Sequence, residues 1–165
     1  MRRVYLSVGS NIDRDTHLRA AYQTLTAEFG RVILSSVYES ESVGFSGDHF
    51  YNLVMGIDTA RSVGELAAML RAIEEANGRS RVGPKFSSRT LDIDVLTYGD
   101  AVGIVDGVAL PRNEILKNAF VLQPLAEIAG AEKHPVSGLS YAEHWAAYDK
   151  AQQKLWVVPF DWAKT

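Results

Sequence analysis

Four segments with the alternation of a β-strand are separated by two segments with the period of an amphipathic helix, and this order is the strongest constraint on the fold. The strand patterns cover residues 4–8, 31–38, 51–58 and 91–98. The helical patterns cover residues 16–29, between the first two strands, and 62–77, between the last two. A β-α-β-β-α-β order is typical of a split arrangement, with an antiparallel sheet and both helices on one face. The sequence therefore predicts the α+β class, with a ferredoxin-like core and flanking helices, in a single domain over residues 1–165.

Local signals predict where the two core helices begin and end. Asp15 or Thr16 is expected to cap the first helix, which ends near Gly30. Ser62 and Glu65 have the spacing of a capping box, in which each side chain satisfies a free backbone N–H group of the other residue. These signals support two helices of ordinary length between the strands.

The remaining segments give weaker patterns. Residues 39–49 are polar and contain glycine, which predicts a loop. Beyond residue 100, the pattern indicates a loop and then a helix that is interrupted or ended near Pro124. Ser140 and Glu143 predict the start of another helix, which an aromatic tail follows.

The composition excludes several other kinds of protein. A net charge of −3 argues against a nucleic-acid binder that holds phosphates by charge alone. The chain contains no cysteine, so it has neither a disulfide framework nor a thiolate zinc site. No apolar run approaches the roughly 20 residues that a membrane helix needs. We therefore expect a cytoplasmic protein that binds neither nucleic acid nor membrane and has no obligate protein partner.

The sign of the charge reverses abruptly just before the last core strand. Four cations and no acid lie between residues 79 and 89, and Asp92 and Asp94 follow at once; the cations are Arg79, Arg81, Lys85 and Arg89. Residues i and i+2 of a strand share a face, roughly 7 Å apart. Such a pair suits Mg²⁺, which takes one or two carboxylates and completes its shell with water and phosphates. An isolated pair of this kind is more often a solvated face, but the cations favour a site that clamps a polyphosphate.

Aromatic and amide side chains could hold a flat heterocycle. Asn52 adjoins Tyr51, while Phe86 and Phe120 precede polar or helical segments. Each aromatic residue taken alone is more often part of a core. The chain has no phosphate-binding glycine loop, and its four histidines lack metal-binding spacing, so a nucleotide would have to be held in another way.

Five segments together resemble the 6-hydroxymethyl-7,8-dihydropterin pyrophosphokinase family of folate biosynthesis. They follow the family order from residue 4 to about residue 130. The most specific is Arg89-Thr90-Leu91-Asp92-Ile93-Asp94. The others are Ser7-Val8-Gly9-Ser10-Asn11, Phe50-Tyr51-Asn52, Ile73-Glu74 with Gly78-Arg79 and Arg81, and Phe120-Val121-Leu122-Gln123-Pro124-Leu125.

The resemblance implies an activity and a role for each site residue. The enzyme would transfer pyrophosphate from ATP, its co-substrate, to the hydroxymethyl group of the pterin and release AMP. Two magnesium ions would be held by Asp92 and Asp94, which act in catalysis with Arg79 and Arg89. The ATP-binding residues would be Glu74, Arg81, Lys85 and Arg112, and the pterin-binding residues would be Ser40, Val43, Asn52, Phe86 and Phe120. Residues 83–88 would form a lid, and no residue is identified as a general base.

The chain also departs from the family pattern. Glu41 and Ser42 occupy the positions of a Pro-Pro pair, and Phe86-Ser87-Ser88 replaces Trp-Gly-Pro. Arg112 follows Pro111 where the family has histidine, and Asn118 stands in place of an arginine. Arg112 is expected to compensate on the ATP side.

Two other hypotheses remain open from the sequence. One is a divergent, non-catalytic member that binds pterin or nucleotide as a sensor or partner subunit, but the intact Asp92 and Asp94 pair argues against it. The other is a ferredoxin-like RNA-binding module, which would need an exposed sheet carrying aromatic side chains and a basic surface.

Overall fold

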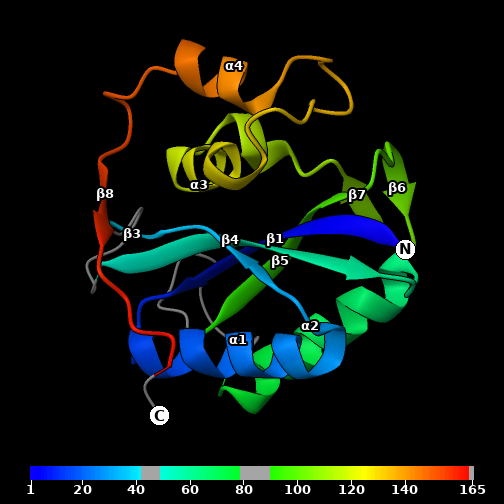
Figure 1. Ribbon diagram of the computed structural model, residues 1–165, viewed down its shortest axis with the longest axis vertical. Helices are drawn as coiled ribbons and strands as arrows, with labels where there is room; N and C mark the ends of the chain where they lie inside the picture. The colour runs from blue at the N-terminus through cyan, green and yellow to red at the C-terminus, as the bar shows by residue number, and fades with distance from the viewer. Residues whose placement is uncertain (42–48, 79–89, 164–165) are drawn as a thin grey trace.

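The computed structural model describes residues 1–41, 49–78 and 90–163 (Figure 1). Its strands are β1 (Arg2–Ser10), β2 (Ile33–Leu34), β3 (Val37–Ser40), β4 (Phe50–Thr59), β5 (Asp92–Tyr98), β6 (Gly103–Val105), β7 (Val108–Leu110) and β8 (Leu155–Val158). Its helices are α1 (Arg14–Phe29), α2 (Val63–Ala76), the 3-10 turn η1 (Asn113–Leu116), α3 (Ala119–Ala129) and α4 (Tyr141–Ala147). No helix in these ranges is both long and apolar enough to cross a membrane.

The central sheet confirms the predicted α+β class and its βαββαβ core. The strands lie in the order β5-β1-β4-β3-β8, with β2 also paired to β4, and all of these pairs are antiparallel. β1 is central because it pairs with both β4 and β5, and β5 lies at one edge. The two strands that carry the predicted site therefore lie on either side of β1.

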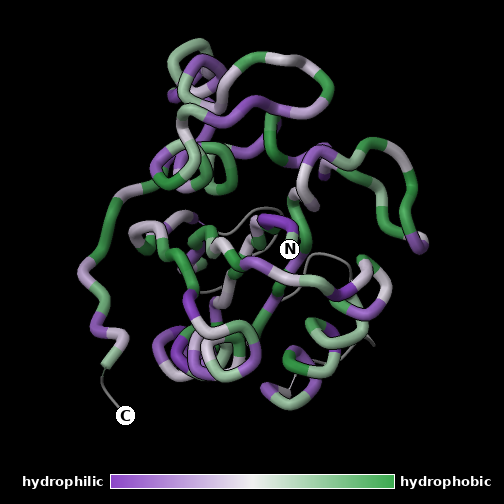
Figure 2. Tube along the Cα trace, turned by 45° about the vertical axis from the view of Figure 1, so that its right-hand side comes forward, coloured by the Kyte–Doolittle hydropathy of each residue, from purple (hydrophilic) through white to green (hydrophobic). Residues whose placement is uncertain are grey.

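Helices cover both faces of this sheet. α1 and α2 pack on one face, and α3 packs on the other with α4 outside it (Figure 1). Along these helices, hydrophobic and hydrophilic residues alternate, which is expected where one side of a helix faces a sheet (Figure 2). The prediction of helices on one face is right for α1 and α2, and the later helices form the third layer. Because α3 covers the second face, the sheet does not offer the exposed platform that the RNA-binding hypothesis requires.

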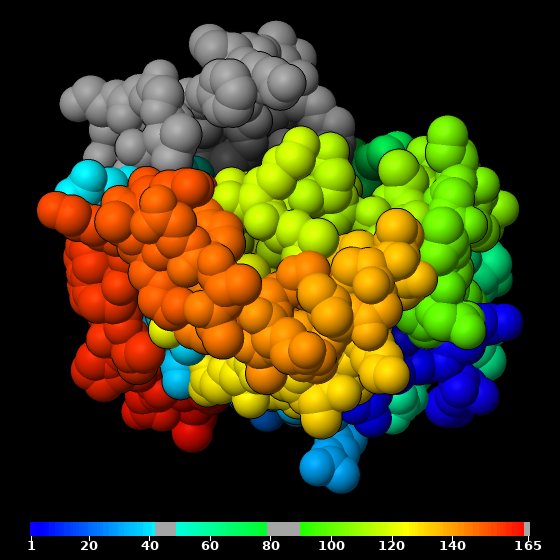
Figure 3. All heavy atoms as spheres, turned by 90° about the horizontal axis from the view of Figure 1, so that it is seen from above, coloured from blue at the N-terminus to red at the C-terminus, as the bar shows by residue number. Residues whose placement is uncertain are grey.

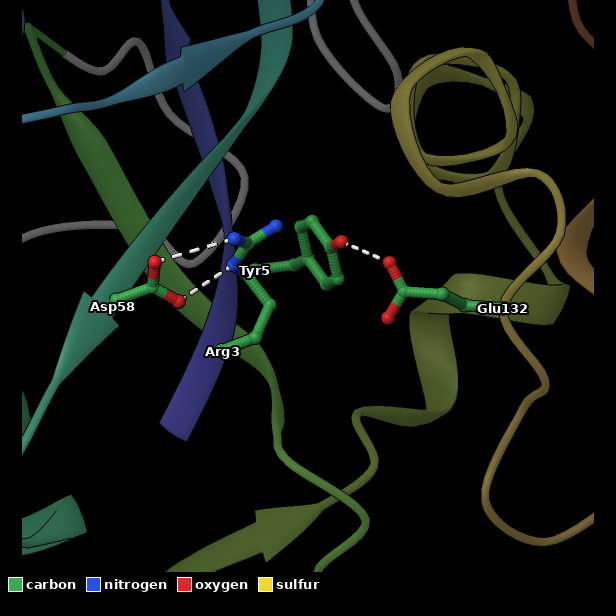
Figure 4. Close-up of polar contacts among 4 residues, drawn as sticks. All are labelled: Arg3, Tyr5, Asp58 and Glu132. Atoms are coloured by element: carbon green, nitrogen blue, oxygen red, sulfur yellow. Dashed lines mark hydrogen bonds and ion pairs between the residues drawn. The ribbon is translucent and has the colours of Figure 1, made fainter. Parts of the chain in front are cut away.

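Two carboxylates fasten the α3 layer to the sheet in addition to apolar packing. Glu127 of α3 accepts hydrogen bonds from the Tyr38 hydroxyl at 2.7 Å and from the Ser36 backbone N–H. Beyond α3, Glu132 accepts a hydrogen bond from the Tyr5 hydroxyl of β1 (Figure 4). Burial and this carboxylate raise the pKa of Tyr5 to about 12, so the hydroxyl keeps its proton. The position of α3 over the sheet is therefore fixed at two separate points.

Several local predictions are confirmed and others are wrong. Ser62 and Glu65 form the predicted capping box of α2, and Gly30 ends α1. The expected cap of α1 at Asp15 or Thr16 is wrong, because the helix begins at Arg14, after a residue with left-handed φ.

The second strand and the later elements also differ from expectation. The predicted strand over residues 31–38 is divided into β2 and β3, and between them the Ser35 hydroxyl accepts the Val54 backbone N–H. Pro124 lies inside α3 and does not end it. The predicted loop after residue 100 contains the β6–β7 hairpin, and the aromatic tail contains β8.

Candidate active site

Two carboxylates and one amide lie in a row across three neighbouring strands. Gly9 of β1 is paired with Asp92 of β5 on one side and with Asn52 of β4 on the other. Paired residues of antiparallel strands point to the same face. Ser7, two residues before Gly9, is likewise paired with Asp94 and with Val54. The Val54 side chain packs in the cluster beneath α3, so the whole row faces the α3 layer.

Asp94 lies in a partly buried and negatively charged environment. Burial, and after it the neighbouring Asp92 carboxylate, raise the pKa of its carboxyl to about 7. Arg112 opposes this shift, with its Nη2 atom 3.6 Å from Asp94 Oδ1, and it also donates from Nε to Glu114 at 3.1 Å. The carboxylates gathered around Asp94 favour the binding of a positive charge at this place.

Glu74 joins α2 to the strand that carries the aspartates. Its side chain is only 5% exposed, and its carboxylate accepts the Ile93 backbone N–H at 2.8 Å. Ile93 lies between Asp92 and Asp94 on the edge strand β5, where such a backbone group needs a partner. Glu74 therefore helps to fix the position of both aspartates, a role that the sequence did not indicate.

A pocket of about 210 Å³ opens beside the aspartates. It is lined by Ala67, Leu70, Arg71, Glu74, Asp92, Ile93, Asp94, Val95, Val108 and Arg112. Pockets that hold a complete drug-sized ligand have volumes of roughly 300 Å³ or more. This pocket is thus large enough for only part of such a ligand.

The donor set fits magnesium better than a transition metal. Within the described ranges, no three histidine, aspartate or glutamate side chains form a group that could hold a metal by themselves. Mg²⁺ requires only one or two carboxylates when substrate phosphates and water supply its other ligands. The Asp92 and Asp94 pair, which lies on one face of β5, meets this requirement.

The predicted pterin residues Asn52 and Ser40 meet on the same sheet face. The Asn52 amide nitrogen donates to the Ser40 hydroxyl at 3.2 Å, and both side chains are 7% exposed. A Cβ atom on Gly9 would lie 2.6 Å from Asn52 Oδ1, which is closer than real contacts allow. Because glycine has no Cβ, position 9 lets the Asn52 side chain approach the backbone of β1 closely.

Phe120 is the second residue of α3 and is half-buried at the margin of the cluster beneath that helix. The residue before the helix is Asn118, which has no side-chain bond to the helix backbone. Instead, Gln153 from the C-terminal segment accepts the Ala119 backbone N–H at 2.8 Å and donates to Asn118 Oδ1 at 3.1 Å. The start of the helix that carries Phe120 is therefore held by a residue far along the chain.

Six predicted site residues lie outside the described ranges. They are Val43, Arg79, Arg81, Lys85, Phe86 and Arg89, together with the lid expected over residues 83–88. The described residues bring together Glu74, Asp92, Asp94 and Arg112 at one end of the row, and Ser40 and Asn52 at the other.

Sequence reasoning missed two polar residues at this site. Arg71 of α2 lines the pocket, and it precedes Glu74 by three residues, a spacing that places both on one side of a helix. That spacing was a usable signal. Gln153 had no such signal, because its contacts with residues 118 and 119 depend on how the tail crosses the fold.

The fold and the site together define a class: a three-layer α+β protein with a carboxylate pair of the kind that binds Mg²⁺ on its central sheet. The family model described as 7,8-dihydro-6-hydroxymethylpterin-pyrophosphokinase (HPPK) matches residues 5–130. The chain belongs to this family.

Similar proteins agree with this assignment. The chain is 39% identical over 133 residues to 2-amino-4-hydroxy-6-hydroxymethyldihydropteridine pyrophosphokinase of Methylorubrum extorquens, covering 78% of this chain and 84% of that protein. It is 33% identical over 145 residues to the folic acid synthesis protein fol1 of Pneumocystis carinii, covering 86% of this chain and 20% of that protein. The fold is similar to that of Plasmodium falciparum HPPK-DHPS, with a TM-score of 0.70, 15% identity, and coverage of 92% of this chain and 45% of the other. The chain thus spans a fifth of fol1 and less than half of HPPK-DHPS.

Proposed function

We propose that this chain transfers the pyrophosphoryl group of ATP to the hydroxymethyl group of 6-hydroxymethyl-7,8-dihydropterin and releases AMP. The observation that carries the proposal is the row of Asn52, Gly9 and Asp92 across three paired strands. Neighbouring strands lie about 4.8 Å apart, so the amide and the carboxylate are held roughly 10 Å apart on one face. A pterin whose ring is read by Asn52 would extend its hydroxymethyl group toward the aspartates.

The pterin would lie between the sheet and the start of α3. Asn52 and Ser40 offer an amide and a hydroxyl that can donate and accept along the edge of a flat ring. Phe120 is placed on the helix that covers this face, and stacking on such a ring contributes about 1–3 kcal/mol per aromatic side chain. Val43 and Phe86 are proposed to complete the pterin site.

ATP would bind at the other end of the row. The pocket of about 210 Å³ would take the nucleoside part, with Glu74 and Arg112 among its walls. Arg112 lies 3.6 Å from Asp94 and can therefore contact a phosphate chain that passes the aspartates. Arg79, Arg81, Lys85 and Arg89 are proposed to line the remaining phosphate path.

Asp92 and Asp94 would hold two magnesium ions. When bound, these ions neutralise phosphate charge and orient the β-phosphoryl group for in-line attack. The hydroxymethyl oxygen would lose its proton to water and form a bond to the β-phosphorus, while the bond from that phosphorus to the α-phosphate oxygen breaks and AMP leaves. The contribution of the chain is to position both substrates and to stabilise charge, which requires no strong base.

Measurement of AMP release from ATP and Mg²⁺, with and without the dihydropterin, tests this proposal. We expect AMP formation that depends on the pterin, and a pyrophosphorylated pterin detected by mass. AMP release independent of pterin would contradict the proposal. Pterin binding without any AMP would instead support the non-catalytic alternative, which the family assignment does not favour.

A further inference from the structure

The segment after α4 crosses from one wall of the proposed pterin site to the other. It leaves α4 on the outer side of α3 and descends to the edge of the sheet, where it forms β8 beside β3 (Figure 1). Seen from above, it runs along one side of the face that α3 and α4 form (orange to red in Figure 3). This segment lies beyond residue 130, where the match to the family model ends.

At the first wall, the segment supplies the cap that α3 lacks. Ala119 is the first residue of α3, and its backbone N–H has no acceptor within its own helix turn. Gln153 Oε1 accepts this N–H at 2.8 Å, and Gln153 Nε2 donates to Asn118 Oδ1 at 3.1 Å. Tyr148 reinforces the contact by donating from its hydroxyl to the Lys117 carbonyl at 2.7 Å. The backbone on the N-terminal side of Phe120 is thus tied to the tail at two points.

At the second wall, the segment pairs with the strand that carries Ser40. Leu155 of β8 is the register partner of Ser40, and Ser40 accepts the hydrogen bond from Asn52. Only Lys154 separates Leu155 from Gln153. An extended chain rises about 3.3 Å per residue, so these two attachments lie within about 7 Å of each other along the tail. Three consecutive residues therefore connect the helix that carries Phe120 to the strand beside Asn52.

We infer that Gln153 is a positioning residue for pterin binding, because it holds Phe120 at a fixed separation from Asn52. The inference rests on the proposed function. Stacking on a flat ring falls off steeply with a displacement of a fraction of an ångström, and the first turn of a helix frays when its backbone groups lose their partners. The proposed ATP site lies at the other end of the row, and the hydrogen bonds of Gln153 go to Asn118 and Ala119, which do not line it. Gln153 therefore acts on pterin affinity and leaves ATP affinity unchanged.

The test measures the Kd of the dihydropterin and of a non-hydrolysable ATP analogue with Mg²⁺ by calorimetry. Gln153→Met keeps the side-chain length but removes both hydrogen bonds, and we expect it to raise the pterin Kd about threefold to thirtyfold. Its ATP-analogue Kd should stay within about twofold of the wild-type value. Gln153→Glu should restore the pterin Kd, since its carboxylate still accepts the Ala119 N–H and the Asn118 amide can rotate to donate. Gln152→Met, at the adjacent exposed glutamine, is the matched control and should change neither Kd.

A double-mutant cycle separates positioning from a general effect on the fold. In a Phe120→Ala background, Gln153→Met should cause no further loss of pterin affinity, because the group that it positions is gone. An additive loss, or an equal loss for both ligands, would overturn the inference. An unchanged pterin Kd in Gln153→Met would also overturn the inference. The proposed function would still stand in that case, because the wild-type chain would bind the pterin. A wild-type chain that binds no pterin would overturn the proposed function first and this inference with it.

Discussion

Replacing Gly9 with alanine tests the geometry of the row directly. The new Cβ would lie 2.6 Å from Asn52 Oδ1, whereas such contacts are essentially never below 3.0 Å. The two atoms must therefore separate by about 0.4 Å to bring 2.6 Å up to 3.0 Å. The atom that gives way is the end of a side chain and not backbone, so the strand keeps its place and the Asn52 amide turns.

The expected cost falls on ligand binding and not on the fold. Gly9 lies outside the left-handed region of φ, so alanine is allowed there and should cost the strand little. A displaced amide loses one or two hydrogen bonds to the pterin, about 1–3 kcal/mol. This corresponds to a rise in the pterin Kd of roughly fivefold to 150-fold. The Kd of an ATP analogue should change by less than about twofold.

Calorimetry with each ligand, together with a thermal melt, measures these quantities. Gly56→Ala is the matched control: it lies on the same strand as Asn52, and its Cβ would meet the Tyr5 ring at 3.1 Å, away from the row. That variant should alter the melting temperature without altering pterin affinity. In an Asn52→Ala background, Gly9→Ala should have no further effect on pterin binding. An unchanged pterin Kd in a folded Gly9→Ala variant would refute the assignment of Asn52 to the pterin.

Three further predictions concern the metal pair and the stacking residue. Asp92→Ala should lower kcat by roughly two orders of magnitude or more while thermal unfolding stays cooperative. A metal ligand contributes several kcal/mol to transition-state stabilisation, and each step of about 1.4 kcal/mol changes the rate tenfold. Near-normal turnover would contradict the metal site. Phe120→Ala should raise the pterin Kd about fivefold to 150-fold by loss of stacking, and equal losses for pterin and ATP would argue against that role. The pKa of Asp94 is raised from 3.8 to about 7, so the folded metal-free chain binds more protons than the unfolded chain in this window. The free energy of unfolding should then fall as pH rises from 3.8 to about 7 and level off above that range. Asp94→Asn should remove this pH dependence in thermal melts recorded with chelator.

The core of the fold was predictable because its signals are local. The capping box at Ser62 and Glu65 and the alternation in β1, β4 and β5 depend on residues a few positions apart. The β6–β7 hairpin could also have been predicted, because Asp106-Gly107 between two apolar segments is a strong turn signal. Both residues have positive φ in the structure. β8 could not have been predicted in this way, because its four residues form a strand only by pairing with the open edge of β3.

The site was predictable in its chemistry and not in its arrangement. The spacing of Asp92 and Asp94 alone indicates two carboxylates on one face, and the resemblance supplied the roles that are proposed for Asn52 and Phe120. The sequence could not show that Glu74 holds the Ile93 N–H or that Arg112 lies 3.6 Å from Asp94, because both contacts join separate elements.

The register of β1 explains why a glycine stands between the two ends of the site. Because β1 pairs with β4 and β5 at once, any residue at position 9 lies between Asn52 and Asp92 and points to the same face. In the proposed reaction, a side chain at that position would fill the space between the pterin hydroxymethyl group and the proposed metal pair. It would also displace Asn52, as the 2.6 Å distance shows. One small residue on the central strand thus meets two requirements of the proposed reaction, a fixed amide and a clear path to the phosphates.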